Sequence, residues 1–443
     1  MAFLAVHGAE SASSVNSVLL ESIAEGPLRR VERDGWTLWL SGVCADVEDR
    51  IRVGVDGSES GGGACLSFEA GELSVERDPL GMLPLWSTPE DGPSAFGPSA
   101  RWFLALNGAE PRLRDDLDRP GPRPENDSPF ENLLRLPAVQ RIYTCGPDPV
   151  VAAPPFDPLV AKDTDRDLAL HTESIGASLE AAVARLPEDD CWRVFLSGGV
   201  DSSSAAALIR ERSRTSPRAS SLGTARGDEF ERAERAADLL GLELERVVVT
   251  DAELLDAFED AVWYGETFDG LTAEVVAQLE CLVRRVAQPA RHVRVVTGYG
   301  ADLLFGGMLE HAAYCEAVGV RTEAELVART RWTNEVSPLF AWRHGVSLHH
   351  LFWRPEVLAA GLAIPLELNR SAPQGKACLR RAAVERGWLD QERAFGPKQA
   401  LTDGTRAQDG LSAALGLEPG YNFQAKTRAA AAIWERRVQA LGR

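Results

Sequence analysis

The stretch "VFLSGGVDSSSAAAL" at residues 194–208 joins a short β-branched run to an apolar helix start through glycines, serines and one acid. Gly198 and Gly199 let the backbone approach a ligand closely, because neither residue carries a Cβ. A helix that begins near Ser202 would direct free backbone N–H groups toward this loop. The pattern predicts a site for a phosphate-bearing ligand, with an ordinary strand–turn–helix connection as the alternative.

Asp201 lies among these donors, where a lone carboxylate would repel a phosphate. A Mg²⁺ ion between the two would remove the conflict, since magnesium binds one or two carboxylates together with phosphate oxygens. The loop is not a Walker A sequence, because no Gly-Lys-Ser/Thr follows, and it is not a GxGxxG sequence. The residues themselves therefore predict a phosphate ligand accompanied by a divalent cation.

The elements that would position this loop follow from the pattern after about residue 165. Long helical segments alternate with short β-branched strands such as "WRVFLS", "ELERVVVT" and "HVRVVTG". Such alternation predicts a parallel sheet covered by helices. Residues 310–443 are expected to be mostly helical.

The front of the chain has a different pattern. Up to about residue 105, short alternating segments are broken by Gly, Asp and Pro, with one helical segment near 11–25. Residues 111–128 and 146–158 are rich in Pro and Asp, which is typical of linkers or surface loops. We expect an α/β chain with a β-rich domain over residues 1–160 and a parallel-sheet domain over residues 161–443.

Composition limits the partners and the compartment. The 443 residues carry a formal net charge of −19, which argues against binding to nucleic acid and is otherwise compatible with simple solubility. The seven cysteines are scattered without a CxxC pair, as expected for reduced thiols in a cytoplasmic protein. No apolar stretch is long enough for a membrane span, and the start "MAFLAVHGAE" lacks the features of a signal peptide.

The six residues S-G-G-V-D-S resemble the pyrophosphate loop of the ATP pyrophosphatases, which adenylate a group and release pyrophosphate. Together with residues 221–249 and "VVTGYGADLLFGGM" at 295–308, they resemble the synthetase domain of the asparagine synthetase superfamily. This resemblance implies ATP and Mg²⁺ as cofactors, with Asp201 and Asp302 as the metal ligands. Two carboxylates that follow neighbouring parallel strands would converge at the carboxyl edge of the sheet. The ATP-binding residues that the resemblance implies are Leu196, Ser197, Gly198, Gly199, Asp201, Ser202, Leu222, Gly223 and Gly298.

The front domain resembles a related module. "ERDPLGMLPLW" at residues 76–86 is similar to a stretch of the glutamine-hydrolysing domain of class II amidotransferases. That domain, an N-terminal-nucleophile (Ntn) sandwich, uses a cysteine at position 2, whereas this sequence has Ala2 and its first cysteine is Cys44. The resemblance therefore implies a degenerate Ntn amidotransferase-like sandwich that does not obtain ammonia from glutamine.

Three further residues resemble those of the β-lactam synthetase and carbapenam synthetase branch. In that branch a tyrosine and a glutamate remove a proton from the attacking amine, and a late lysine stabilises the transition state; the matching positions are Tyr299, Glu335 and Lys398. An amine is protonated at neutral pH, so a base is needed before it can attack. The alternatives are a packing role for Tyr299, a solvated loop acid and a surface lysine. Lys376 is predicted to be structural or to face a phosphate.

The resemblance predicts an ATP- and Mg²⁺-dependent ligase that adenylates the carboxylate of a small amino-carboxylate substrate and closes an amide within that molecule. An intermolecular amide ligase, a peptide macrolactam cyclase and a non-catalytic relic remain as alternatives. The stretches "QALTDGTR" and "DLLFGG" depart from the β-lactam-forming pattern and leave the substrate and the ring size open. A homodimer is possible.

Overall fold

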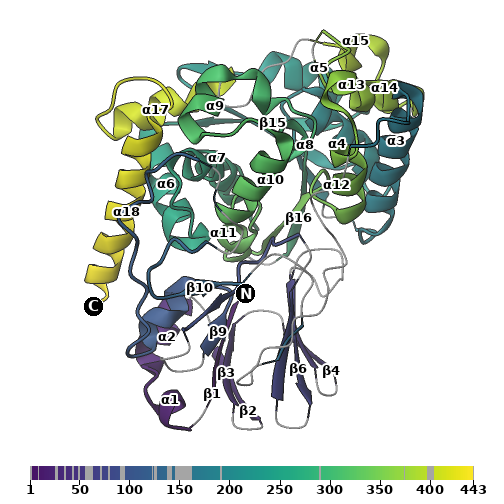
Figure 1. Ribbon diagram of the computed structural model, residues 1–443. Coiled ribbons are helices and arrows are strands. Elements are labelled where there is room, and N and C mark those ends of the chain that lie inside the picture. Colours follow the sequence, from purple (N-terminus) through teal and green to yellow (C-terminus); the bar gives the residue numbers. More distant parts are fainter. Residues whose placement is uncertain are drawn as a thin grey trace.

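A computed structural model describes residues 2–7, 9–24, 28–33, 36–41, 44–47, 50–54, 63–69, 72–77, 80–89, 95–121, 123, 127–136, 142–144, 162–189, 192–288, 291–373, 375–396 and 404–442. The chain has a β-rich front part and a larger back part in which helices surround a sheet (Figure 1). The expected α/β class is confirmed. The expected boundary at residue 160 lies outside the described residues.

Two antiparallel sheets form the front part, with strand orders β10-β8-β9-β1-β3-β2 and β11-β7-β6-β5-β4. The strands are β1 (Ala2–His7), β2 (Leu28–Arg33), β3 (Trp36–Ser41), β4 (Cys44–Val47), β5 (Arg50–Gly54), β6 (Gly63–Glu69), β7 (Glu72–Arg77), β8 (Trp86–Ser87), β9 (Ala95–Gly97), β10 (Leu134–Arg135) and β11 (Ile142–Thr144). The helices are α1 (Ala9–Ser13), α2 (Ser17–Ala24) and the 3-10 helix η1 (Ala100–Ala105).

The alternation of side chains along β1 explains why these sheets stack. Successive residues of a strand point to opposite faces of the sheet. Phe3 and Ala5 therefore pack against the second sheet, around Leu66 and Val75. Leu4 and its alternate neighbour Val6 face the other way, into a core that the front part shares with the back part.

The back sheet has the order β14-β13-β12-β16-β17, with β15 paired to β13. Its strands are β12 (Trp192–Phe195), β13 (Arg218–Thr224), β14 (Gly227–Asp228), β15 (Glu243–Val249), β16 (Val293–Thr297) and β17 (Val346–His350). All of these pairings are parallel except that of β13 with β14. The parallel sheet predicted from the sequence is confirmed, and the carboxyl ends of its strands share one edge.

Helices cover both faces of this sheet. Trp192 and Val194 belong to the core formed with α3, α4, α5 and α14, whereas Phe195 belongs to the core formed with α6, α7 and α18. The helices are α3 (Leu168–Ala184), α4 (Val200–Arg210), α5 (Phe230–Leu240), α6 (Asp251–Gly265), α7 (Gly270–Val286), α8 (Ala301–Leu304), η2 (Met308–Glu310), α9 (Ala312–Val318), α10 (Glu323–Trp332), α11 (Leu339–Trp342), α12 (Pro355–Leu362), α13 (Leu366–Asn369), α14 (Ala377–Glu385), α15 (Gln391–Ala394), α17 (Ala407–Ala414) and α18 (Phe423–Ala440). In the part of the chain that the structure describes, none of them combines the length and apolar character needed to cross a bilayer.

Strand β17 lies within the segment expected to be mostly helical. Its five residues, "VSLHH", are all buried, and it pairs with β16 from Val293↔Val346 to Thr297↔His350. The described part of this segment is mostly helical, as expected, and β17 is the exception. A five-residue strand with two histidines has too little periodicity to distinguish it from helix in the sequence. Its neighbour in the sheet, distant in sequence, stabilises it.

An aromatic cluster joins the front and back parts. The ring of Phe130 lies 5.5 Å from Trp86 of the front part, 5.3 Å from Phe268 and 5.6 Å from Trp434 of α18. All four side chains are buried in one continuous core. The two parts of the chain therefore do not have separate hydrophobic interiors.

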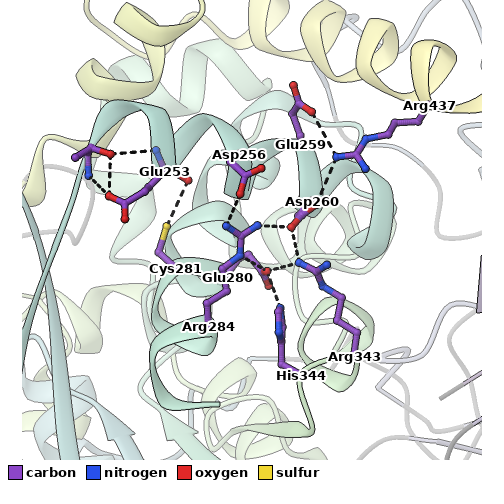
Figure 2. A network of polar contacts seen from close by, with 11 residues as sticks. Glu253, Asp256, Glu259, Asp260, Glu280, Cys281, Arg284, Arg343, His344 and Arg437 are labelled. Carbon is purple, nitrogen blue, oxygen red and sulfur yellow. Dashed lines mark hydrogen bonds and ion pairs between the residues drawn. The ribbon is translucent and has the colours of Figure 1, made fainter. Parts of the chain in front are cut away.

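A polar network fixes α6 against α7, α11 and α18 (Figure 2). The carboxylate of Asp260 on α6 accepts from Arg284 and Arg343 and forms an ion pair with Arg437 at 3.6 Å. Glu280 on α7 accepts from the first two of these arginines and, at 2.8 Å, from the imidazole of His344. Because each carboxylate meets more than one arginine, the network fixes the direction of α7, whose first turns line the site described next.

Candidate active site

The loop between β12 and α4 is formed as the sequence predicts. Gly198 has φ +76°, and a Cβ there would lie 2.4 Å from the backbone carbonyl of Arg232, so both conformation and space require glycine. The hydroxyl of Ser202 accepts from the backbone N–H of Ser197 at 3.1 Å and folds the loop back on the helix. No side chain caps α4. Its first N–H groups are therefore available to an anion.

A cavity of about 340 Å³ opens beside this loop at the carboxyl edge of the sheet. That volume is in the range of small-molecule sites. Of the predicted ATP-binding residues, those that line it are Leu196, Ser197, Gly198, Gly199, Asp201, Ser202, Leu222 and Gly298. Gly223 does not line it; a Cβ there would lie 2.6 Å from the ring of Phe230, so this glycine makes room for packing behind the cavity.

Gly298 brings the two predicted metal ligands together. A Cβ at this position would lie 2.5 Å from the backbone nitrogen of Ser202 and 2.6 Å from the carbonyl carbon of Asp201. The end of β16 therefore packs directly on the first turn of α4. Asp302, one turn further on in α8, reaches the same wall of the cavity as Asp201.

Lys376 lies between these two carboxylates. Its ammonium donates to Asp201 and, at 2.8 Å, to Asp302, and the side chain is buried. Burial lowers the pKa of Lys376, but the two carboxylates outweigh this effect and the net pKa is raised. For Asp201, burial and the charge of Asp302 raise the pKa against the opposing influence of the lysine. The sequence interpretation left Lys376 outside the set of site residues.

Its backbone explains where Lys376 points. The residue has φ +56°, follows Gly375 at φ +68°, and begins α14 without a side-chain cap. The pair of left-handed residues turns the chain sharply, so that the lysine is directed at the cavity. A Gly-Lys pair just before a helix was the available signal in the sequence.

The donor set at this point fits Mg²⁺. Asp201 Oδ1 is buried and has no hydrogen-bond partner among the described residues. The described residues contain no cluster of three or more side chains that could hold a metal alone. Two carboxylates at the wall of this cavity match magnesium, which usually completes its coordination with water and substrate phosphates.

A second cavity of about 170 Å³ adjoins the first. Tyr299, Asp302 and Gly298 line both cavities, so the two share a wall. The hydroxyl of Tyr299 is buried and has no hydrogen-bond partner among the described residues. Its ring lies 5.3 Å from that of His350, a buried histidine whose pKa burial lowers to about 3. A neutral imidazole thus supports the ring and leaves the phenol directed at the cavity.

Glu335 lines the second cavity with Tyr299. Burial, followed by the negative charge of Asp269, raises the pKa of Glu335 to about 8. Asp269 itself caps α7 by accepting from the N–H of Thr272 at 2.9 Å and pairs with Arg329 at 2.5 Å. Tyr299 and Glu335, which are far apart in sequence, are therefore brought to one cavity. Lys398 lies outside the described residues.

Replacing Glu335 with glutamine is expected to stabilise the protein at alkaline pH. A carboxyl whose folded pKa is raised stabilises the fold below its unfolded pKa, and this contribution is lost as pH rises toward 8. The neutral amide avoids the cost of ionising a buried acid, so the free energy of unfolding at pH 9 should rise by about 1–3 kcal/mol. Urea denaturation of both proteins at pH 5 and pH 9 measures this. Equal stability at pH 9 would show that Glu335 is hydrated.

The fold and these cavities place the chain among mixed α/β proteins with a ligand site at the carboxyl edge of a parallel sheet. A family model described as asparagine synthase matches residues 174–337. Carboxyethyl-arginine beta-lactam-synthase of Streptomyces clavuligerus is 32% identical over 243 residues, which is 55% of this chain and 46% of that protein. These matches confirm that the chain resembles the asparagine synthetase superfamily, near its β-lactam synthetase branch.

Other relatives include a glutamine-hydrolysing asparagine synthetase of Triphysaria versicolor, 24% identical over 57% of this chain and 42% of that protein. A protein named amidase chry2 from Gibberella zeae is 28% identical over 53% of this chain and 38% of that protein. The chain thus matches less than half of the length of these relatives. The resemblance to this superfamily that the sequence motifs predicted is confirmed.

Proposed function

We propose that this protein adenylates the carboxylate of a small amino-carboxylate substrate with ATP and then closes an amide within the same molecule, forming a lactam. The observation that carries the proposal is the wall shared by the two cavities. It would hold a nucleotide on one side and the substrate on the other. The reacting carbon would then lie beside Tyr299 and Asp302.

In the first half-reaction a substrate carboxylate oxygen bonds to the α-phosphorus of ATP, and the bond from that phosphorus to the β-phosphate oxygen breaks. The loop at Ser197–Ser202 would bind the departing pyrophosphate through its N–H and hydroxyl groups. Mg²⁺, held by Asp201 and Asp302, would neutralise charge on the phosphates. Lys376, which bridges these carboxylates, keeps their buried charges compensated.

In the second half-reaction the substrate amine attacks the acyl carbon, and the bond from this carbon to the phosphate oxygen of AMP breaks. The amine must lose its protons. Tyr299 would donate its hydroxyl proton to the Glu335 carboxylate as it accepts a proton from the amine; both residues line the same cavity. By the resemblance, Lys398 would stabilise the negative charge that grows on the acyl-adenylate oxygens.

The front part is proposed to be a degenerate Ntn amidotransferase-like sandwich, with a domain division at residues 1–160 and 161–443. The two stacked antiparallel sheets of the described front part support this. The alternative function is an intermolecular amide ligase that uses ammonia or another amine. The asparagine synthetase relatives favour keeping it as the second candidate.

The test is pyrophosphate release from ATP and Mg²⁺ with a panel of β-amino acids, with and without ammonia or glutamine. We expect release that depends on one class of amino-carboxylate, a product lighter than its substrate by one water, and no stimulation by glutamine. Product that incorporates added ammonia would replace lactam closure with the alternative. Glutamate formed from glutamine by the pure protein would contradict the proposed degenerate front part.

A further inference from the structure

A buried arginine of the front part reaches the loop that carries Glu335. Arg135, on β10, is 4% exposed, and its guanidinium lies 5.4 Å from the ring of Trp86. It donates to the backbone carbonyls of Arg331 and Trp332 and, at 2.7 Å, to the side-chain oxygen of Asn334. One side chain of the front part thus makes three hydrogen bonds to the residues immediately before Glu335.

The place of these bonds on the back part has a physical meaning. Helix α10 ends at Trp332, and the last carbonyls of a helix have no partner within it. A cation at this end also interacts favourably with the helix dipole. The guanidinium of Arg135 therefore satisfies the end of α10 and fixes where the helix stops and the loop begins.

A second link runs through Asn334, which has φ +60°. Its side-chain nitrogen donates at 3.0 Å to the backbone carbonyl of Glu266, at the end of α6. The side chain of Glu266, in turn, accepts from Ser99 Oγ at 2.6 Å and Trp86 Nε1 at 3.1 Å. The backbone N–H groups of Ala100 and Arg101 also donate to it. The front part therefore holds the side chain of Asn334 in two ways: its oxygen directly through Arg135, and its nitrogen indirectly through Glu266.

We propose that the front part serves as the frame that positions Glu335, and that Arg135 is the positioning residue through which it acts. This inference rests on the proposed function for its effect on turnover. The geometry of the loop does not depend on the proposed function. Three hydrogen bonds from Arg135 to the Arg331–Asn334 segment, and the front-part donors to the buried side chain of Glu266, hold the loop whatever the reaction is. A front part without hydrolase activity would keep this role.

The test compares Arg135→Leu with Arg112→Leu, a matched control. Arg112 is an exposed front-part arginine whose ion-pair partner, Glu131 at 3.8 Å, lies in the same part. Hydrogen exchange is followed for peptides that cover residues 329–337, where the N–H of Thr333 donates to Arg329 and that of Ser337 to Asn334. We expect exchange there to be at least about tenfold faster in Arg135→Leu, while peptides of β12 and β16 are unchanged.

Turnover is measured as two half-reactions in the same variants. Pyrophosphate exchange should stay within about threefold of the parent in Arg135→Leu, and product formation should fall about 10- to 100-fold, since misplaced catalytic groups lower only the step they serve. Arg135→Lys, which retains the charge but not the forked donor geometry, should recover part of the product. An equal loss in both half-reactions would overturn the proposal. So would unchanged product formation together with unchanged hydrogen exchange at residues 329–337.

If Arg135→Leu does not fold, Asn334→Gly removes the second link and retains the left-handed backbone, which glycine adopts readily. This variant should show the same faster hydrogen exchange at residues 329–337, the same loss of product formation and the same retained pyrophosphate exchange. If the parent protein makes no product with any substrate of the panel, the proposed function fails. The comparison of hydrogen exchange between Arg135→Leu and Arg112→Leu still decides whether Arg135 holds the loop, so the two failures are distinguishable.

Discussion

Substituting asparagine for Asp201 or Asp302 is expected to reduce pyrophosphate release about 10³-fold or more. A bound metal ion contributes several kcal/mol of charge stabilisation, and about 4 kcal/mol corresponds to a factor of ~10³ in rate. Both half-reactions should be lost, because the adenylate cannot form. The measurement is pyrophosphate release at saturating ATP over a range of Mg²⁺ concentrations.

The fold should survive these substitutions. Asparagine keeps the shape of aspartate, and in either variant Lys376 retains one carboxylate partner. Asp238→Asn, on the exposed side of α5, is the matched control and should leave release unchanged. Release within tenfold of the parent in either site variant, with an unchanged Mg²⁺ requirement, would remove Asp201 or Asp302 from the metal site.

Tyr299→Phe and Glu335→Gln should separate the two halves of the reaction. Loss of a general base costs about 10²–10⁴-fold, so product formation should fall by that order. Positional pyrophosphate exchange should remain within a few-fold of the parent, because the proposed dyad acts only after adenylation. The double variant should lose no more than the worse single one, since residues that act as a unit are not additive.

Tyr264→Phe provides the control for removal of a phenol. Its ring contacts the guanidiniums of Arg101 and Arg343 and lines neither of the two cavities. Product formation should not change in it. If Tyr299→Phe abolishes pyrophosphate exchange as completely as it abolishes product formation, this tyrosine serves nucleotide binding or folding. The lactam-forming proposal then loses its main support.

Product formation should also rise with pH through about 8. Glu335 can accept a proton only when ionised, and burial together with Asp269 raises its pKa to about 8. A substrate amine bound beside it would favour the ionised form and move this limb of the profile to lower pH. The limb should disappear in Glu335→Gln, whose residual rate should follow only the titration of the amine.

The glycine loop and the parallel sheet could be predicted because their causes are local. Gly198 and Gly199 after a β-branched run, with small residues opening a helix, already specify a strand–loop–helix site. The convergence of Asp201 and Asp302 followed from one general rule about the edges of parallel sheets. The residues predicted to bind ATP therefore line the cavity, apart from Gly223, which packs against Phe230.

Lys376, Arg135 and strand β17 could not be predicted in the same way. Each depends on contacts between segments far apart in sequence: Lys376 with Asp201, Arg135 with Trp332, and Val346 with Val293. Periodicity and motifs carry no information about such pairings without the fold. The raised pKa of Glu335 is of the same kind, since it arises from burial and from Asp269, which caps the start of α7 far away in sequence.

The aromatic cluster of Trp86, Phe130, Phe268 and Trp434 limits how this chain can be engineered. A chimera that combined the back part with a foreign front would have to reproduce the shape of two aromatic rings at the junction, or else leave Phe268 and Trp434 facing water. Exposed patches of that kind promote aggregation. Under the proposed function, substrate redesign would therefore change the lining of the second cavity within an intact chain.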